Sequence, residues 1–209
     1  MNPIALPTTP KFQLTGISWE TYEALLRDIG QHRRFRLTYY RGTLDLMVPS
    51  PEHERYKKVI GRFVETLAEE LEIAIEPFGS TTFKKPELAG VEPDECFYVR
   101  NLDAIRGLRR FDYNRDPPPD LAVEIDIASS SKNRLATYAE IGIAEVWRYD
   151  GNRLVVYQLE NGDYVEGDRS GIFPTIPISQ IAEFLDRSLE TDYLTLVRQF
   201  QAWIQHGDR

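Results

Sequence analysis

The stretch that decides the fold reads PPPDLAVEIDIASSS and occupies residues 117–131. Its prolines cannot continue a helix, and the β-branched residues that follow them are typical of a strand. Because side chains of a strand alternate between its faces, one face carries apolar residues and the other carries Asp120, Glu124 and Asp126. Carboxylates inside a domain are costly to desolvate unless a metal ion or a basic side chain pairs with them. The function therefore depends largely on which of these partners they have.

The composition is that of a single globular domain. The chain has 209 residues, of which 42% are hydrophobic and 28% charged, so it holds enough apolar material for a core. Its one cysteine excludes an intramolecular disulfide framework and favours a reducing cytoplasm. No apolar run approaches the roughly 20 residues that span a bilayer, so we expect no membrane partner. We expect residues 1–16 to form a flexible tail and residues 17–209 to form one domain.

The net charge of −8 at pH 7 bears on nucleic-acid binding. It argues against a protein that coats nucleic acid non-specifically, because that affinity depends on Lys and Arg. It does not exclude a nuclease, because an acidic metal site contributes to the total and basic residues can still cluster on one face.

Helical and strand patterns alternate along the chain. Apolar residues at three- and four-residue spacing predict a long helix over residues 53–71. The other expected helices cover residues 17–30, 132–141, 178–189 and 192–205. The expected strands lie within residues 35–48, 74–85, 94–99, 121–127, 144–149 and 153–159, and the charged connection 100–116 is expected to be mobile. This order predicts a mixed β-sheet flanked by helices, an α/β or α+β fold, with C-terminal helices over about 178–205.

A second acidic strand lies upstream of the first. Asp94 opens the predicted strand 94–99 and precedes Glu124 by 124 − 94 = 30 residues. If the two strands are neighbours and both carboxylates face the same side, the pair is suited to holding one hard cation.

Larger parts of the chain resemble a known family. Pro93-Asp94 followed by Glu124-Ile125-Asp126 resembles the PD-(D/E)XK nuclease superfamily. More narrowly, the chain is similar to the Uma-two family of restriction-endonuclease-like proteins. The matching stretches are YRGTLDLMVPSPEH at 40–53, GVEPD at 90–94, PDLAVE at 119–124, Tyr138, and GIAEVW at 142–147. The resemblance implies a restriction-endonuclease-like core with the site on two neighbouring strands.

The resemblance also implies a chemistry. Asp94 and Glu124 would bind a divalent metal, Mg²⁺ or Mn²⁺, and the carbonyl of Ile125 would be a further ligand. Such a metal supplies a nucleophilic water and stabilises charge on the phosphate during phosphodiester hydrolysis. The implied activity is that of a metal-dependent endonuclease. The resemblance does not supply the biological substrate, and our own expectation is DNA.

The chain departs from the family pattern at its basic residues. Asp126 stands where the superfamily usually has its lysine, and an aspartate cannot replace that charge. The family places a basic residue on the next helix, and here that residue is Arg134. An arginine binds phosphate well but stays protonated and does not act as a general base. Lys132 is a candidate substitute, and His53, at the start of the long helix, is either a site residue or a capping residue.

Three functional hypotheses remain open at this point. The first is the metal-dependent nuclease. The second is a catalytically degenerate module that binds nucleic acid or protein partners, which the replacements at Asp126 and Arg134 favour. The third is a structural protein that forms a homodimer through its C-terminal helices.

Overall fold

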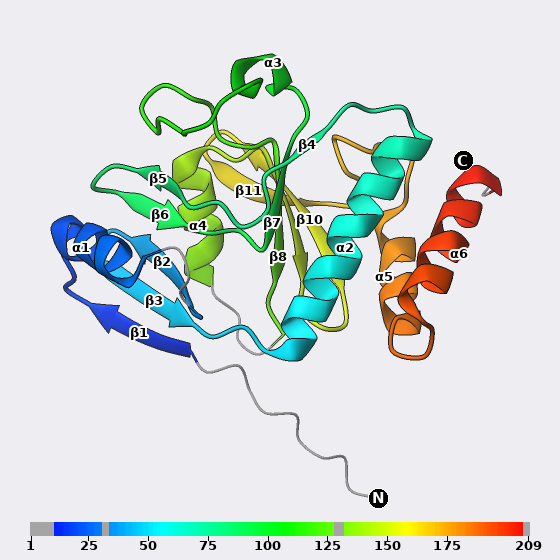
Figure 1. The fold of residues 1–209 in the computed structure, drawn as a ribbon, viewed down its shortest axis with the longest axis horizontal. Coiled ribbons are helices and arrows are strands. Elements are labelled where there is room, and N and C mark those ends of the chain that lie inside the picture. Colours follow the sequence, from blue (N-terminus) through cyan, green and yellow to red (C-terminus); the bar gives the residue numbers. More distant parts are fainter. Residues whose placement is uncertain (1–10, 31–33, 128–131, 207–209) are drawn as a thin grey trace, which may run out of the picture.

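The computed structural model describes residues 11–30, 34–127 and 132–206, and only the backbone at residues 132 and 133. Two β-sheets and the helices around them make up the fold (Figure 1). The larger sheet has the strand order β11-β10-β9-β8-β7-β4. Its strands are β4 (Glu76–Pro77), β7 (Glu95–Tyr98), β8 (Leu121–Ile125), β9 (Glu145–Tyr149), β10 (Leu154–Glu160) and β11 (Asp163–Gly167). Strands β8 and β9 are parallel and the other pairs are antiparallel, so the predicted mixed sheet is confirmed.

The smaller sheet is entirely antiparallel and has the strand order β1-β3-β2-β6-β5. Its strands are β1 (Lys11–Thr15), β2 (Arg36–Tyr40), β3 (Thr43–Met47), β5 (Phe83–Lys85) and β6 (Ala89–Val91). The sequence patterns predicted one sheet, whereas the hairpin 35–48 belongs to this second one. Residues 11–15 were expected to lie in the N-terminal tail, but they form β1 because they pair along the whole of β3.

The two faces of strand β2 contact different parts of the molecule. It joins β3 through a two-residue turn in which Arg41 and Gly42 have φ values of 45° and 88°, the positive values that a type I′ hairpin turn requires. Leu37 and Tyr39 are buried beneath helix α1 (Trp19–Ile29). Because side chains alternate along a strand, Arg36 and Thr38 point to the opposite face.

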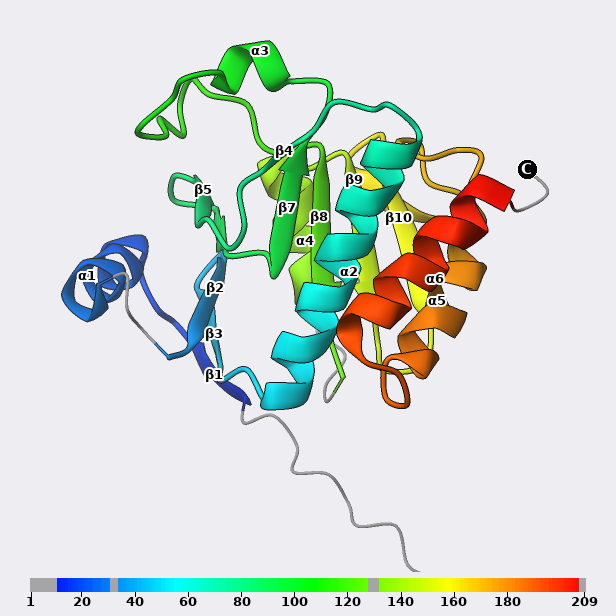
Figure 2. The ribbon, with the colours of Figure 1, turned by 45° about the vertical axis from the view of Figure 1, so that its right-hand side comes forward.

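Helices cover both faces of the larger sheet, as Figure 2 shows. Helices α2 (Pro51–Glu70), α5 (Ile178–Arg187) and α6 (Tyr193–His206) pack on one face, and α4 (Lys132–Ile141) packs on the other. The main core lies between the first three helices and the sheet, where Phe63 of α2 stacks on Phe200 of α6 with ring centroids 4.0 Å apart. The apolar face of α6 is therefore part of the core of one chain.

The connection between β7 and β8 is anchored to the rest of the domain. It contains a short helix, α3 (Leu102–Ile105), whose Ile105 is buried. Further along, the ring of Phe111 meets Phe83 of β5 edge-on, with centroids 5.4 Å apart. Within the described ranges, no helix combines the length and the apolar character that crossing a bilayer would demand.

Candidate functional site

Asp94 directly precedes β7, and Glu124 lies on the neighbouring strand β8. Strands β7 and β8 pair in an antiparallel register in which Glu95 faces Val123, and the backbone N–H of Asp94 donates to the carbonyl of Val123 at 3.1 Å. Asp94 itself stands outside this register, and its side chain accepts a hydrogen bond from the N–H of Ile125, the residue after Glu124. Both residues are buried, with exposures of 0% and 2%, and Arg134 interacts electrostatically with both carboxylates.

Three groups surround the carboxylate of Asp94. Its Oδ2 accepts a hydrogen bond from the backbone N–H of Ile125 at 2.6 Å, and its Oδ1 forms an ion pair with Arg36. The ring of His53 is the third group, with Nε2 lying 3.1 Å from Oδ2. Burial alone would raise the pKa of Asp94, but the charge of Arg36 and the contact with His53 outweigh it and lower this pKa to about 2. Asp94 is therefore held as a carboxylate at neutral pH.

Helix α4 supplies the partners of Glu124. Arg134 forms an ion pair with Oε1, and the Tyr138 hydroxyl donates to Oε2 at 2.7 Å. Arg134 also donates from Nε to the hydroxyl of Thr38 on β2 at 3.2 Å, which joins α4 to the smaller sheet. Burial raises the pKa of Tyr138, so its phenol remains a neutral donor. Arg134 and Tyr138 also interact electrostatically with Asp94, so the two carboxylates share one environment.

His53 reaches the site from the start of α2. Ser50 caps this helix by accepting a hydrogen bond from the backbone N–H of His53 at 3.1 Å, which is the arrangement expected of a serine N-cap. The imidazole is 2% exposed and its Nδ1 lies 3.5 Å from the carboxylate of Glu54. Neither ring nitrogen makes a hydrogen bond of good geometry with any group in the described part of the chain. The ring is thus buried in the site with unused hydrogen-bonding capacity.

Arg36 is the site residue that the sequence patterns missed. It comes from β2 of the smaller sheet, and besides Asp94 its guanidinium donates to the Pro93 carbonyl at 3.1 Å and to the Ser80 hydroxyl at 3.3 Å. It also lies 3.5 Å from the half-exposed carboxylate of Glu54. The available signal was the alternation along β2, where a buried face of Leu37 and Tyr39 leaves Arg36 on the other face.

Asp126 is a predicted site residue whose observed partner lies on another strand. Asp126 follows β8 and accepts hydrogen bonds from Arg148 of β9 at 2.7 and 3.2 Å, so these contacts lead away from Asp94. Lys132 begins α4, but its side chain lies outside the described residues. Arg134, the basic residue that the family pattern indicated, does contact the carboxylate of Glu124.

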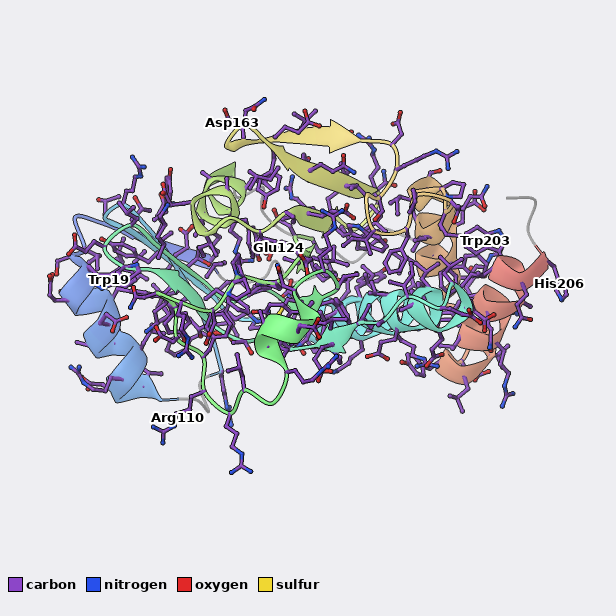
Figure 3. All side chains as sticks on the ribbon, turned by 90° about the horizontal axis from the view of Figure 1, so that it is seen from above. Trp19, Arg110, Glu124, Asp163, Trp203 and His206 are labelled. Atoms are coloured by element: carbon purple, nitrogen blue, oxygen red, sulfur yellow. The ribbon has the colours of Figure 1, made fainter. Side chains whose placement is uncertain are left out.

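The donor atoms of the site are hard oxygens. Asp94 and Glu124 supply carboxylates, and the carbonyl of Ile125 points to the same neighbouring strand as its N–H, which is bonded to Asp94. In the described ranges no three His, Cys, Asp or Glu side chains form a preformed metal cluster. Because Mg²⁺ commonly binds through one or two carboxylates and keeps several waters, two carboxylates and a carbonyl still suit it. Glu124 lies in the middle of the molecule, whereas Arg110 projects from its edge (Figure 3).

Comparisons with known proteins agree with this architecture. No curated protein matches the chain. Among solved structures, a protein from Anabaena variabilis ATCC 29413, described as a "putative nuclease belonging to DUF820", is similar with a TM-score of 0.51 and 12% identity. The match covers 90% of this chain and 99% of that one, and at this identity it shows the fold. The model of the Uma2 family, described as "Putative restriction endonuclease", matches residues 19–183. The chain therefore belongs to the Uma2 family, and its fold is restriction-endonuclease-like.

Proposed function

We propose that the protein is a divalent-metal-dependent endonuclease that hydrolyses phosphodiester bonds of DNA. The observation that carries this proposal is one buried cluster in which Asp94, directly before β7, and Glu124, on the neighbouring β8, lie with Arg36 and Arg134. Phosphodiester hydrolysis needs anionic ligands for a metal and cationic groups for the phosphate, and this cluster contains both. The descriptions of the family and of the similar structure support the same reaction class.

In this proposal the carboxylates of Asp94 and Glu124 and the carbonyl of Ile125 hold Mg²⁺ or Mn²⁺. Such a cation would provide a nucleophilic water at neutral pH and would stabilise charge on the phosphate. The Tyr138 hydroxyl orients Glu124, to which it donates at 2.7 Å. The N–H of Ile125 orients Asp94 in the same way.

The basic residues act on the substrate. Guanidinium groups match the geometry of phosphate oxygens, so Arg134 and Arg36 are assigned to the non-bridging oxygens of the scissile phosphate. Because arginine stays protonated, neither residue serves as the base. His53 contacts Asp94 and is assigned as a positioning residue for that carboxylate.

The test is cleavage of supercoiled plasmid by the purified full-length protein with Mg²⁺ or Mn²⁺. We expect nicking or linearisation that is lost in Asp94→Asn and in Glu124→Gln. A matched control is Asp45→Asn, which alters a buried carboxylate of the smaller sheet, paired with Gln13 and Lys11, and should retain cleavage. Equal cleavage by the wild type and both site variants would reveal a contaminating nuclease and remove the support.

One observation favours a second candidate, the non-catalytic module that binds nucleic acid or protein. Each carboxylate already has a guanidinium partner, and no lysine side chain of the described residues contacts either of them. This candidate predicts retention of labelled DNA by the wild type without turnover under any divalent metal. Metal-dependent cleavage that requires Asp94 would exclude it.

A further inference from the structure

The charged side chains at the centre of the site pair two by two. Arg36 is bound to Asp94 and Arg134 to Glu124, and all four residues are at least nine-tenths buried. Both carboxylates are therefore neutralised by side chains of the chain itself. The central cluster has no net charge, in contrast to a metal site whose free carboxylates await a cation.

This pairing of charges opposes the binding of a divalent cation without an accompanying anion. Two added positive charges would face two guanidinium groups that cannot release a proton, in a region shielded from water. Binding would require at least one guanidinium to leave its carboxylate. Such a departure leaves a buried charge without its partner, which is strongly unfavourable unless a new anion replaces it.

A phosphodiester is an anion of the required kind. Its non-bridging oxygens accept hydrogen bonds from guanidinium groups as carboxylate oxygens do. Arg36 already has further contacts that allow a change of partner, because it also donates to the Ser80 hydroxyl and lies 3.5 Å from the half-exposed Glu54. Arg134 is likewise held by Thr38 as well as by Glu124.

We propose that in the free protein Arg36 and Arg134 pair with the two carboxylates that bind the metal. When the substrate binds, both guanidinium groups move to its phosphate, so that metal and phosphate bind cooperatively. This inference rests on the proposed function, because it concerns the same carboxylates. It assigns the two arginines a second role besides phosphate binding. Their ion pairs compete with a cation for the two carboxylates until a phosphodiester is present. The free protein should accordingly bind divalent metal weakly.

The first test uses the wild type alone and follows Mn²⁺ binding by the loss of the free-ion electron paramagnetic resonance signal. The probe for the phosphate is dimethyl phosphate, a stable diester with one negative charge. We expect an excess of dimethyl phosphate to tighten Mn²⁺ binding by roughly 5- to 150-fold, the range typical of coupled sites. No variant is needed, so loss of folding cannot obscure this result.

The second test removes one guanidinium at a time. Arg134→Gln and Arg36→Gln should bind Mn²⁺ more tightly than the wild type without dimethyl phosphate, and should gain less from adding it. The matched control is Arg148→Gln, which also removes one positive charge. Arg148 lies on β9 in register with Glu124, but it pairs with Asp126. Its Mn²⁺ affinity should change little.

Two kinds of result would overturn the proposal in different ways. If the wild type binds Mn²⁺ equally with and without dimethyl phosphate, and Arg134→Gln and Arg36→Gln match it, the coupling is absent while the nuclease proposal stands. The specific role of the two arginines is likewise excluded if Arg148→Gln tightens binding as much as the other two variants. If Asp94→Asn binds Mn²⁺ as the wild type does in every sample, there is no metal site at these carboxylates and the proposed function fails with it.

Discussion

The backbone N–H of Ile125 donates to Oδ2 of Asp94 at 2.6 Å, so the residue before β7 is tied to the last residue of β8. The bond replaces a ladder hydrogen bond at the point where the two strands begin to separate. It fixes one carboxylate oxygen and leaves the other to Arg36. The same hydrogen bond therefore ends the pairing of β7 with β8 and orients the carboxylate of Asp94 in the site.

Replacing Asp94 tests how much this feature stabilises the fold. Asp94→Ala leaves the Ile125 N–H without its acceptor and Arg36 buried without its carboxylate. We expect a loss of about 3–5 kcal/mol in the free energy of unfolding, measured by urea denaturation. Asp94→Asn should lose less, because its amide oxygen can still accept from Ile125. An Asp94→Ala protein as stable as the wild type would show that the contact contributes nothing.

Tyr138→Phe removes one hydroxyl and leaves Oε2 of the buried Glu124 without its donor. We expect the free energy of unfolding to fall by about 1–3 kcal/mol, because an unsatisfied buried acceptor bears its full desolvation cost. The comparison is Tyr164→Phe, which removes a hydroxyl that donates to the Ile143 carbonyl at 2.6 Å. Both variants should lose stability, and only Tyr138→Phe should weaken Mn²⁺ binding. Equal Mn²⁺ affinities in the two variants would mean that Tyr138 does not orient Glu124.

Phe200 tests whether α6 belongs to the core or to a surface between chains. Its ring is fully buried against Phe63 and Phe184, so Phe200→Ala should cost about 3–5 kcal/mol of stability in a urea titration. Leu194 lies on the same helix and is 60% exposed, so Leu194→Ala should stay within about 0.5 kcal/mol of the wild type. The reverse order of the two effects would indicate that α6 is stabilised by a second chain.

Glu95 provides a pH-dependent test on the opposite face of the sheet. Burial raises its pKa above the ordinary value of 4.5, and the charges of Lys57 and Lys58 offset this only in part. The unfolded chain then loses the proton at lower pH than the folded protein, so stability falls as pH rises through this range and stays lower at neutral pH. Glu95→Gln should therefore raise the melting temperature at neutral pH, and the gain should vanish below pH 4.5. A gain that persists in acid would exclude titration as its cause.

Local patterns were sufficient to predict the face of β8 on which Glu124 lies. Strand alternation places Glu124 on the face opposite Val123 and Ile125, and the same rule places Asp94 with Cys96. The expectation for Glu124 is met, because Glu124 contacts α4 whereas Val123 and Ile125 belong to the core on the other face. Asp94 lies just before β7, and a hydrogen bond from Ile125 links its side chain to β8.

The basic half of the site could not be predicted in the same way. Arg36 and Asp94 are 58 residues apart in the sequence. They meet because β2 pairs with β6, which ends at Val91, shortly before Asp94. With only three residues, β6 is too short for its sequence to predict this pairing. The contact that Asp126 makes could not be predicted for a related reason. It lies just past the end of β8, where Arg148 of β9 binds it, and this cross-strand partner is 22 residues away in the sequence.

The two-residue turn at Arg41 and Gly42 sets the phase of β2. If β2 slipped by one residue against β3 and β6, its two faces would exchange. Leu37 would then meet the carboxylate of Asp94, and a guanidinium would lie under α1. The ionic character of the site thus depends on the register of β2, and a slip of one residue would change the chemistry without altering any residue of the acidic pair.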